Sequence, residues 1–194
     1  MHNFFLHQKK FKAIGTAYLP REDSYLLVEA VKILPGKTVL DMGCGTGIQG
    51  INALLQGAKK CVFADVNHIA LENARENASL LGMEGKAEFV ESNLFEKIDG
   101  KFDCIVFNPP YVISKKIDEP DIDGGKHGRH TLDRFLRQFP KFLNENGECY
   151  FVQSSFNGTE KTEEILEWQK MRYEIAARKK LFFEELIVYK CFNG

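Results

Sequence analysis

The hydrophobic and polar positions of the chain follow two patterns, one typical of buried strands and one typical of amphipathic helices. The apolar run from Phe102 to Phe107 is the clearest strand, because the two prolines after Asn108 cannot extend a hydrogen-bond ladder. The other predicted strands cover residues 37–42, 61–65, 87–91, 148–154, 173–182 and 185–192. The predicted helices cover residues 22–31, 48–55, 67–81, 131–139 and 159–170.

Local signals indicate where some of these helices begin and end. Asn67 is a suitable N-cap for the helix that follows it, and Gly82 suits the C-terminal end of the same helix. Thr131 is expected to cap the helix that carries Leu132 and Phe135.

Strands that alternate with helices predict an α/β fold, with a parallel sheet and helices on both faces. The last two strands are expected to form an antiparallel pair. The 194 residues fit one domain over 1–194, in which residues 1–20 form an N-terminal arm or a first strand. Ligands bind at the carboxyl ends of the strands in such sheets. Asp65, Asn93 and Asn108 all fall at this edge, so we expect the site there.

The loop Asn108-Pro109-Pro110-Tyr111 directly follows the predicted central strand. Proline restricts its own backbone and that of the residue before it, so the Asn108 side chain and the Pro109 carbonyl are expected to face the same space. Two such acceptors and the ring of Tyr111 would hold the N–H groups of a planar nitrogen and turn its lone pair toward an incoming carbon. The same tetrapeptide also fits a plain turn that ends a strand.

A glycine-rich loop, Asp41-Met42-Gly43-Cys44-Gly45-Thr46-Gly47, follows the first predicted strand of the sheet. It permits close approach to a ligand, and Asp65 at the end of the next strand can accept both hydroxyls of a ribose. The spacing of Gly45, Gly47 and Gly50 also satisfies the dinucleotide pattern Gly-x-Gly-x-x-Gly. A methyl donor with a cationic amino group is favoured, because Asp41 would repel a pyrophosphate.

Composition narrows the function classes. The formal net charge of -1, with 27% charged and 44% hydrophobic residues, argues against a surface that is basic overall. Five widely spaced cysteines indicate buried thiols in a reducing compartment, and we expect neither disulfides nor a metal site. No stretch approaches the roughly 20 apolar residues of a membrane span. We therefore expect a cytoplasmic protein. The long polar segment 112–130 is expected to form a wall or lid on the substrate side.

Three separated motifs, in this order, resemble the HemK/PrmC family of class I protein glutamine methyltransferases. The resemblance covers residues 18–157 and is closest to the short branch that acts on archaeal and eukaryotic class 1 release factors, since the helical N-terminal domain of the bacterial members is missing. The motifs are Tyr18 to Leu27, the central pair formed by Asp41 to Gly47 and Asn108 to Tyr111, and Gly124 to Arg129 with Asp133.

The resemblance implies a Rossmann-like class I methyltransferase domain with a mostly parallel seven-stranded sheet. It implies that S-adenosylmethionine is the cofactor, S-adenosylhomocysteine its product, and the glutamine of a Gly-Gly-Gln loop the substrate. Asn108, Pro109 and Tyr111 would hold the target amide. The residues implied in cofactor binding are Ser24, Asp41, Gly43, Cys44, Gly45, Asp65, Asn93, Leu94 and Asn108. Family members often carry Asp where this chain has Asn93, and Asn can still accept the same bond.

The resemblance also implies a small zinc-binding activator subunit, with strand 61–65 and its surroundings as the place to look. Two other functions stay open at this point. An RNA or DNA methyltransferase that acts on an exocyclic amino group would use Asn108 in nearly the same way. The second open function is a scaffold that binds the methyl donor without transferring its methyl group.

Overall fold

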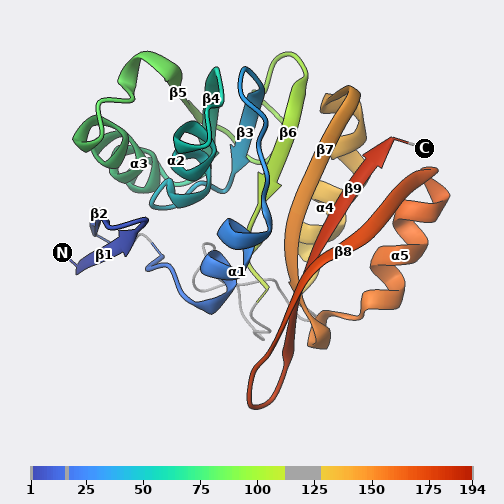
Figure 1. Cartoon of the computed structure of the whole chain (residues 1–194). Coiled ribbons are helices and arrows are strands. Elements are labelled where there is room, and N and C mark those ends of the chain that lie inside the picture. Colours follow the sequence, from blue (N-terminus) through green and yellow to red (C-terminus); the bar gives the residue numbers. More distant parts are fainter. Residues whose placement is uncertain (1, 16–17, 112–127, 194) are drawn as a thin grey trace.

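The computed structural model describes residues 2–15, 18–111 and 128–193 of the chain (Figure 1). A seven-stranded sheet runs through its centre, with the strand order β5-β4-β3-β6-β7-β9-β8. The first five of these strands pair in parallel, and β9 runs antiparallel to both of its neighbours. The strands are β3 (Thr38–Met42), β4 (Lys60–Asp65), β5 (Ala87–Glu91), β6 (Phe102–Phe107), β7 (Leu143–Ser154), β8 (Met171–Lys180) and β9 (Glu185–Asn193). The predicted fold class is confirmed.

Helices cover both faces of the sheet, because its strands carry apolar side chains on both sides (Figure 1). On β6, Cys104 and Val106 pack toward one core, and Ile105 and Phe107 pack toward the other. The first core includes α1 (Glu22–Ala30), α2 (Ile48–Leu55) and α3 (His68–Leu80), and the second includes α4 (His130–Gln138) and α5 (Thr159–Trp168). Short 3-10 turns are η1 (Glu84–Lys86), η2 (Phe139–Phe142) and η3 (Ser155–Asn157).

The N-terminal region is a two-stranded hairpin, formed by β1 (His2–Leu6) and β2 (Lys9–Ala13), apart from the main sheet. Its inward residues join the first core, and Phe4 stacks on Phe11 with ring centroids 5.2 Å apart. Asn73 and Asn77 of α3 bind the backbone of Lys12. The pattern of the sequence left this region undecided between an arm and a strand, and the contacts with α3 explain why it forms a packed hairpin.

The structure corrects two local expectations. Arg129, and not Thr131, is the N-cap of α4, because the Arg129 carbonyl accepts from the Asp133 backbone N–H at 2.8 Å. The strand expected to begin at Glu148 begins at Leu143, where the pairing with β6 shifts register. By contrast, the Asn67 side chain caps α3 as predicted and accepts from the N–H of Ile69 at 2.9 Å.

The crossover from β5 to β6 brings the chain back past β3, so β3 and β6 are neighbours although β4 and β5 lie between them in sequence. This reversal of strand order opens a crevice at the carboxyl ends of β3 and β6, where ligands bind in sheets of this kind. Most of the predicted substrate-side loop, residues 112–127, lies outside the described residues.

Candidate active site

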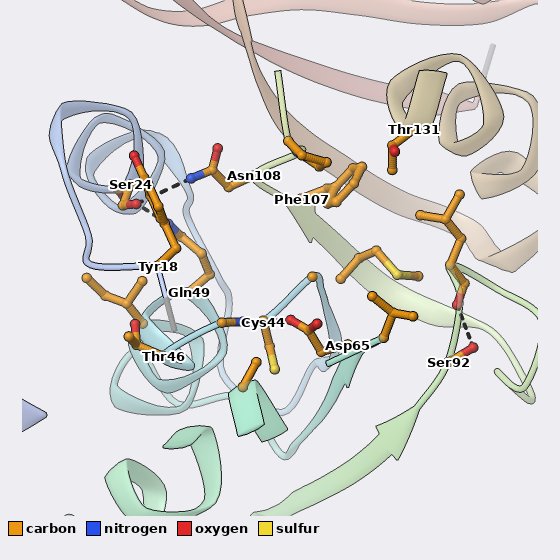
Figure 2. A pocket seen from close by; sticks show the side chains of 18 of the residues that line it. Tyr18, Ser24, Cys44, Thr46, Gln49, Asp65, Ser92, Phe107, Asn108 and Thr131 are labelled. Atoms are coloured by element: carbon orange, nitrogen blue, oxygen red, sulfur yellow. Dashed lines mark hydrogen bonds between the residues drawn. The ribbon is translucent and has the colours of Figure 1, made fainter. Parts of the chain in front are cut away.

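A cavity of about 290 Å³ lies at the carboxyl edge of the sheet, at the lower end of the size range for small-molecule sites. It is lined by the ends of β3, β4 and β6, by the turn after β5, and by residues around the start of α1. The structure brings together here eight of the residues implied in cofactor binding, namely Ser24, Gly43, Cys44, Gly45, Asp65, Asn93, Leu94 and Asn108. Residues far apart in sequence therefore share one site (Figure 2).

The glycine-rich loop is held against the end of β4. The N–H of Cys44 donates to the Ala64 carbonyl at 3.0 Å, and the N–H of Gly45 donates to the Asp65 carboxylate at 3.0 Å. Gly43 has a φ of +60°, and a Cβ there would lie 3.1 Å from the Phe107 ring. The glycine thus lets the loop pass close to β6 and keep its backbone at the cavity wall.

Asp41 occupies a different place from the one expected for a residue that touches a ligand. It is 1% exposed, is not among the described residues that line the cavity, and accepts from the N–H of Gly50 at 2.8 Å. Burial raises the pKa of its carboxyl well above the usual range, a shift that the bond from Gly50 opposes. Asp41 therefore ties β3 to the first turn of α2, and its direct contact with a ligand stays a prediction.

Asp65 lies at the cavity wall, where β4 ends. Its two oxygens accept from the backbone N–H groups of Gly45 and Asn67 at 3.0 and 2.9 Å. Each carboxylate oxygen can accept more than one hydrogen bond, so the same group can fix the loop and receive ligand hydroxyls. The position suits the ribose contact expected from the sequence.

Asn93 and Leu94 form the turn after β5 at another side of the cavity. The Asn93 side chain donates to Glu96 at 2.9 Å and accepts from Arg134 at 3.2 Å. Leu94 has a φ of +52°, which is unusual for a leucine, and its carbonyl accepts from the Ser92 hydroxyl at 2.7 Å. These bonds fix the shape of the turn; contact of Asn93 with an adenine ring stays a prediction.

Asn108 follows β6 and points its carboxamide toward the start of α1 (Figure 2). Its nitrogen donates to Asp23 at 3.2 Å and to the Ser24 hydroxyl at 3.3 Å. Its oxygen is buried and has no hydrogen-bond partner among the described residues. A buried acceptor without a partner is costly, so this oxygen is a candidate to accept a hydrogen bond from a ligand.

The other residues of the tetrapeptide surround this group. Pro110 is one of the described residues that line the cavity, whereas the adjacent Pro109 is buried and Tyr111 is half-buried. The Tyr111 hydroxyl donates to Asp23 at 3.0 Å. Burial and the nearby Asp23 carboxylate raise the pKa of Tyr111, so it is a neutral hydrogen-bond donor. Contact of Pro109 and Tyr111 with a target amide stays a prediction.

Several residues of the site were missed from sequence. Tyr18, Gln49 and Thr131 line the cavity. Asp23 is a different case, because its sequence position left a site role and a plain helix-start role equally open; it accepts a hydrogen bond from Asn108. The Gln49 side chain donates to the Ser24 carbonyl at 2.9 Å, and its own oxygen is buried without a partner among the described residues. The sequence did carry one signal for Gln49, because a polar glutamine is unusual in a helix as apolar as α2.

No group of three or more His, Cys, Asp or Glu side chains in residues 2–15, 18–111 and 128–193 is placed to hold a metal ion. In the same part of the chain, no helix is long and apolar enough to cross a membrane.

Comparison with known families gives a match over most of the chain. The family model described as "Methyltransferase small domain" matches residues 22–183. The chain belongs to this family. It is therefore a methyltransferase, and this decides between the methyl-donor and dinucleotide interpretations of the glycine-rich loop.

Individual relatives refine the comparison. The chain is 41% identical over 185 residues to the "Putative protein N5-glutamine methyltransferase MJ0928" of Methanocaldococcus jannaschii, with 92% of this chain and 93% of that protein covered. Among solved structures, it is similar to a chain of the E. cuniculi Mtq2-Trm112 complex, described as methylating the eRF1 translation termination factor. That match has a TM-score of 0.69 and 27% identity, and covers 91% of this chain and 98% of the other.

A relative with another kind of substrate also matches. The chain is 39% identical over 159 residues to the ribosomal RNA small subunit methyltransferase C of Serratia proteamaculans. That match covers 79% of this chain and 42% of the relative, so the chain spans less than half the length of that enzyme. The resemblance to glutamine methyltransferases is confirmed, and one similar relative is named for methylation of ribosomal RNA.

Proposed function

We propose that this methyltransferase uses S-adenosylmethionine to methylate the side-chain amide of a glutamine, in the Gly-Gly-Gln loop of a class 1 release factor. The Asn108 oxygen carries this proposal, because it is a buried acceptor that faces no donor among the described residues. A glutamine amide supplies N–H groups of the required kind. The protein substrates named for the archaeal relative and for the Mtq2 complex agree with this class of target.

The cavity has features that fit the proposed cofactor. Buried oxygens of Gln49 and Asn108 lack partners among the described residues, and the Asp65 carboxylate stands where hydroxyls can reach it. Gly43 and Gly45 place their backbone atoms at the wall of the cavity. In our proposal these residues hold the cofactor together with Ser24, Cys44, Asn93 and Leu94, while Asp41 supports the loop from behind. When bound, the cofactor supplies an electrophilic methyl group, whose bonding electron pair stays on sulfur as the methyl leaves.

The protein's own part in this reaction is to position the target nitrogen. The Asn108 oxygen and the Pro109 carbonyl accept its N–H groups, and the Tyr111 ring flanks it. The lone pair of an amide nitrogen is delocalised, so holding the N–H groups in place turns that pair toward the methyl carbon. One proton of the nitrogen then leaves to solvent. In well-oriented reactions, positioning of this kind can lower the barrier by about 7 kcal/mol or more.

Transfer of a radiolabelled methyl group tests the proposed substrate. The protein is incubated with labelled S-adenosylmethionine and either a class 1 release factor or total RNA from the same source. We expect label in the release factor, on the glutamine of its Gly-Gly-Gln loop, and none there when that glutamine is replaced by alanine. Label in RNA alone would overturn the protein substrate and favour the second candidate, which the match to the RNA methyltransferase supports.

We also propose that a small activator subunit binds this chain, as Trm112 accompanies Mtq2 in the similar structure. A zinc site in that subunit and an interface near β4 are parts of the same proposal. Because release factors act on ribosomes, the proposed substrate places the reaction in the cytoplasm. Co-purification with a tagged form of this chain, followed by mass spectrometry, would identify the subunit.

A further inference from the structure

Asp23 is a buried carboxylate that joins three separate segments of the chain. It is 2% exposed and lies in the first turn of α1. It accepts from the hydroxyls of Tyr18 and Tyr111, at distances down to 3.1 and 3.0 Å, and from the Asn108 amide at 3.2 Å. It also accepts from the backbone N–H and the hydroxyl of Ser24, at 2.6 and 3.2 Å. The carboxylate thus connects the start of α1 with the first and last residues of the Asn108–Tyr111 loop.

We propose that Asp23 is the positioning residue that fixes the carboxamide of Asn108 with its nitrogen turned inward and its oxygen free for the target N–H. This inference rests on the proposed role of Asn108. Only the amide nitrogen can donate to a carboxylate, since the reversed amide would place two acceptor oxygens against each other. The position of Asp23 therefore selects one of the two orientations of the side chain.

Ser24 reinforces the same choice. Its hydroxyl has one proton, which it donates to Asp23 at 3.2 Å. Toward Asn108, 3.3 Å away, the Ser24 oxygen can therefore only accept. Both neighbours of the Asn108 nitrogen are thus acceptors, and a reversed amide would lose both bonds.

The negative charge of Asp23 also affects the side-chain oxygen of Asn108. A carboxylate that accepts from an amide nitrogen draws electron density toward the amide oxygen, because bonds in such a chain polarise one another. The Asn108 oxygen becomes a better acceptor for the target N–H. The side-chain donors that reach Asp23 in the described part of the chain are the neutral groups of Tyr18, Ser24, Asn108 and Tyr111.

The ordinary role of an acidic residue at a helix start does not account for this arrangement. An exposed carboxylate is enough to favour the positive end of a helix dipole, and Glu22 supplies one next to Asp23. Asp23 is instead buried and receives donors from residues 85 and 88 positions away. Glu22 provides a matched control, since it is acidic, adjacent in sequence and exposed.

A double-mutant cycle tests the proposal with the full-length protein. Asp23→Asn should lower kcat at least tenfold while leaving the Kd for S-adenosylmethionine within about twofold. In an Asn108→Ala background the same change should cost less than twofold, because Asp23 then has no carboxamide to orient. Glu22→Gln should leave kcat unchanged in both backgrounds. An equal loss from Asp23→Asn in both backgrounds, or no loss at all, would overturn the proposal.

A second measurement needs neither activity nor a variant of Asp23. In nuclear Overhauser spectra of the wild-type protein, the side-chain NH₂ protons of Asn108 should contact the β protons of Ser24, with the signal assigned by its loss in Asn108→Ala. Absence of these contacts would show a reversed amide and overturn the inference even where Asp23→Asn fails to fold. Since this result does not depend on the substrate, failure of the release-factor proposal would leave it standing.

Discussion

At the scale of single residues, the two ends of the Asn108 carboxamide have different tasks. The nitrogen is held by Asp23 and Ser24, and the buried oxygen has no partner in the described part of the chain. An amide can serve in this way at any ordinary pH because it does not titrate, and an acid or a base at position 108 would present only one of the two functions.

Replacement of Asn108 by alanine should therefore separate cofactor binding from turnover. We expect Asn108→Ala to keep the Kd for S-adenosylmethionine within a modest factor and to lower kcat by about 100-fold, the scale of a lost positioning contact. Calorimetry and labelled methyl transfer measure the two quantities. Asn146→Ala, an exposed asparagine in the first half of β7, serves as the control and should change neither. Near wild-type turnover in Asn108→Ala would contradict the role given to this residue.

The cysteines give a second prediction at this scale. All five are free thiols, and all are buried. Burial raises the pKa of each thiol, and for Cys44, at the cavity wall, the carboxylates of Asp65 and Asp41 add to the effect.

Because the thiolate is the reactive form, native thiols should react very slowly with a disulfide reagent at neutral pH and faster as the pH rises. In urea all five should react. Cofactor at saturation should slow the modification of Cys44 and leave Cys149, far inside the second core, unchanged. Rapid reaction of several native thiols would contradict their burial.

At the scale of elements, the N-terminal hairpin is attached to the site through α3. Asn77 is fully buried; its nitrogen donates to the carbonyls of Lys12 and Thr46 at 2.8 and 2.9 Å, and its oxygen accepts from the Lys12 N–H at 2.9 Å. One side chain thus joins β2, α3 and the glycine-rich loop. A hairpin without a place in the main sheet depends on such contacts.

Removal of this side chain should destabilise the protein. Asn77→Ala leaves backbone groups of Lys12 and Thr46 without their partner, at an expected cost of about 1–3 kcal/mol in the free energy of unfolding. Urea denaturation measures this change. Glu76→Ala, exposed on the same helix, should change stability by less than about 0.5 kcal/mol. Equal stability of the two variants would show that the hairpin does not depend on Asn77.

At the scale of the whole molecule, the cavity is assembled from both halves of the sheet. β3 and β4 supply the glycine-rich loop and Asp65, β6 supplies Asn108, and the start of α1 closes the other side (Figure 2). A ligand seated there contacts segments that are separate in the unfolded chain. Its binding is therefore coupled to folding of the domain as a unit.

S-adenosylmethionine should accordingly stabilise the protein against heat. At a free concentration 100 times its Kd, the gain is about 2.7 kcal/mol. For a chain of this length that corresponds to a rise in Tm of about 5–10 °C. Scanning calorimetry measures the shift, which Asn108→Ala should retain. A nicotinamide dinucleotide should give none; a shift with the dinucleotide and none with S-adenosylmethionine would contradict the assignment of the cavity.

The sequence by itself determined most of the elements of the main sheet and its helices, and the edge at which the site is expected. Short apolar runs and helical spacing are local properties, so β5, β6 and α2 were predicted with their observed bounds. Asp65, Asn93 and Asn108 each come just after a predicted strand, and parallel pairing then places them at one edge. The roles expected of Asp65 and Asn108 came from their residue types and from the family resemblance, that of Asn93 from the resemblance alone, and all three stay predictions.

Only the tertiary structure decided how these residues are supported. Asp23 and Asn108 are 85 residues apart, and no local pattern shows that their side chains meet. The same holds for Asp41, whose carboxylate turns toward Gly50, and for Thr131, which faces the cavity because α4 begins before it. Long-range packing sets side-chain direction at such positions, whereas local propensity fixes only the type of element.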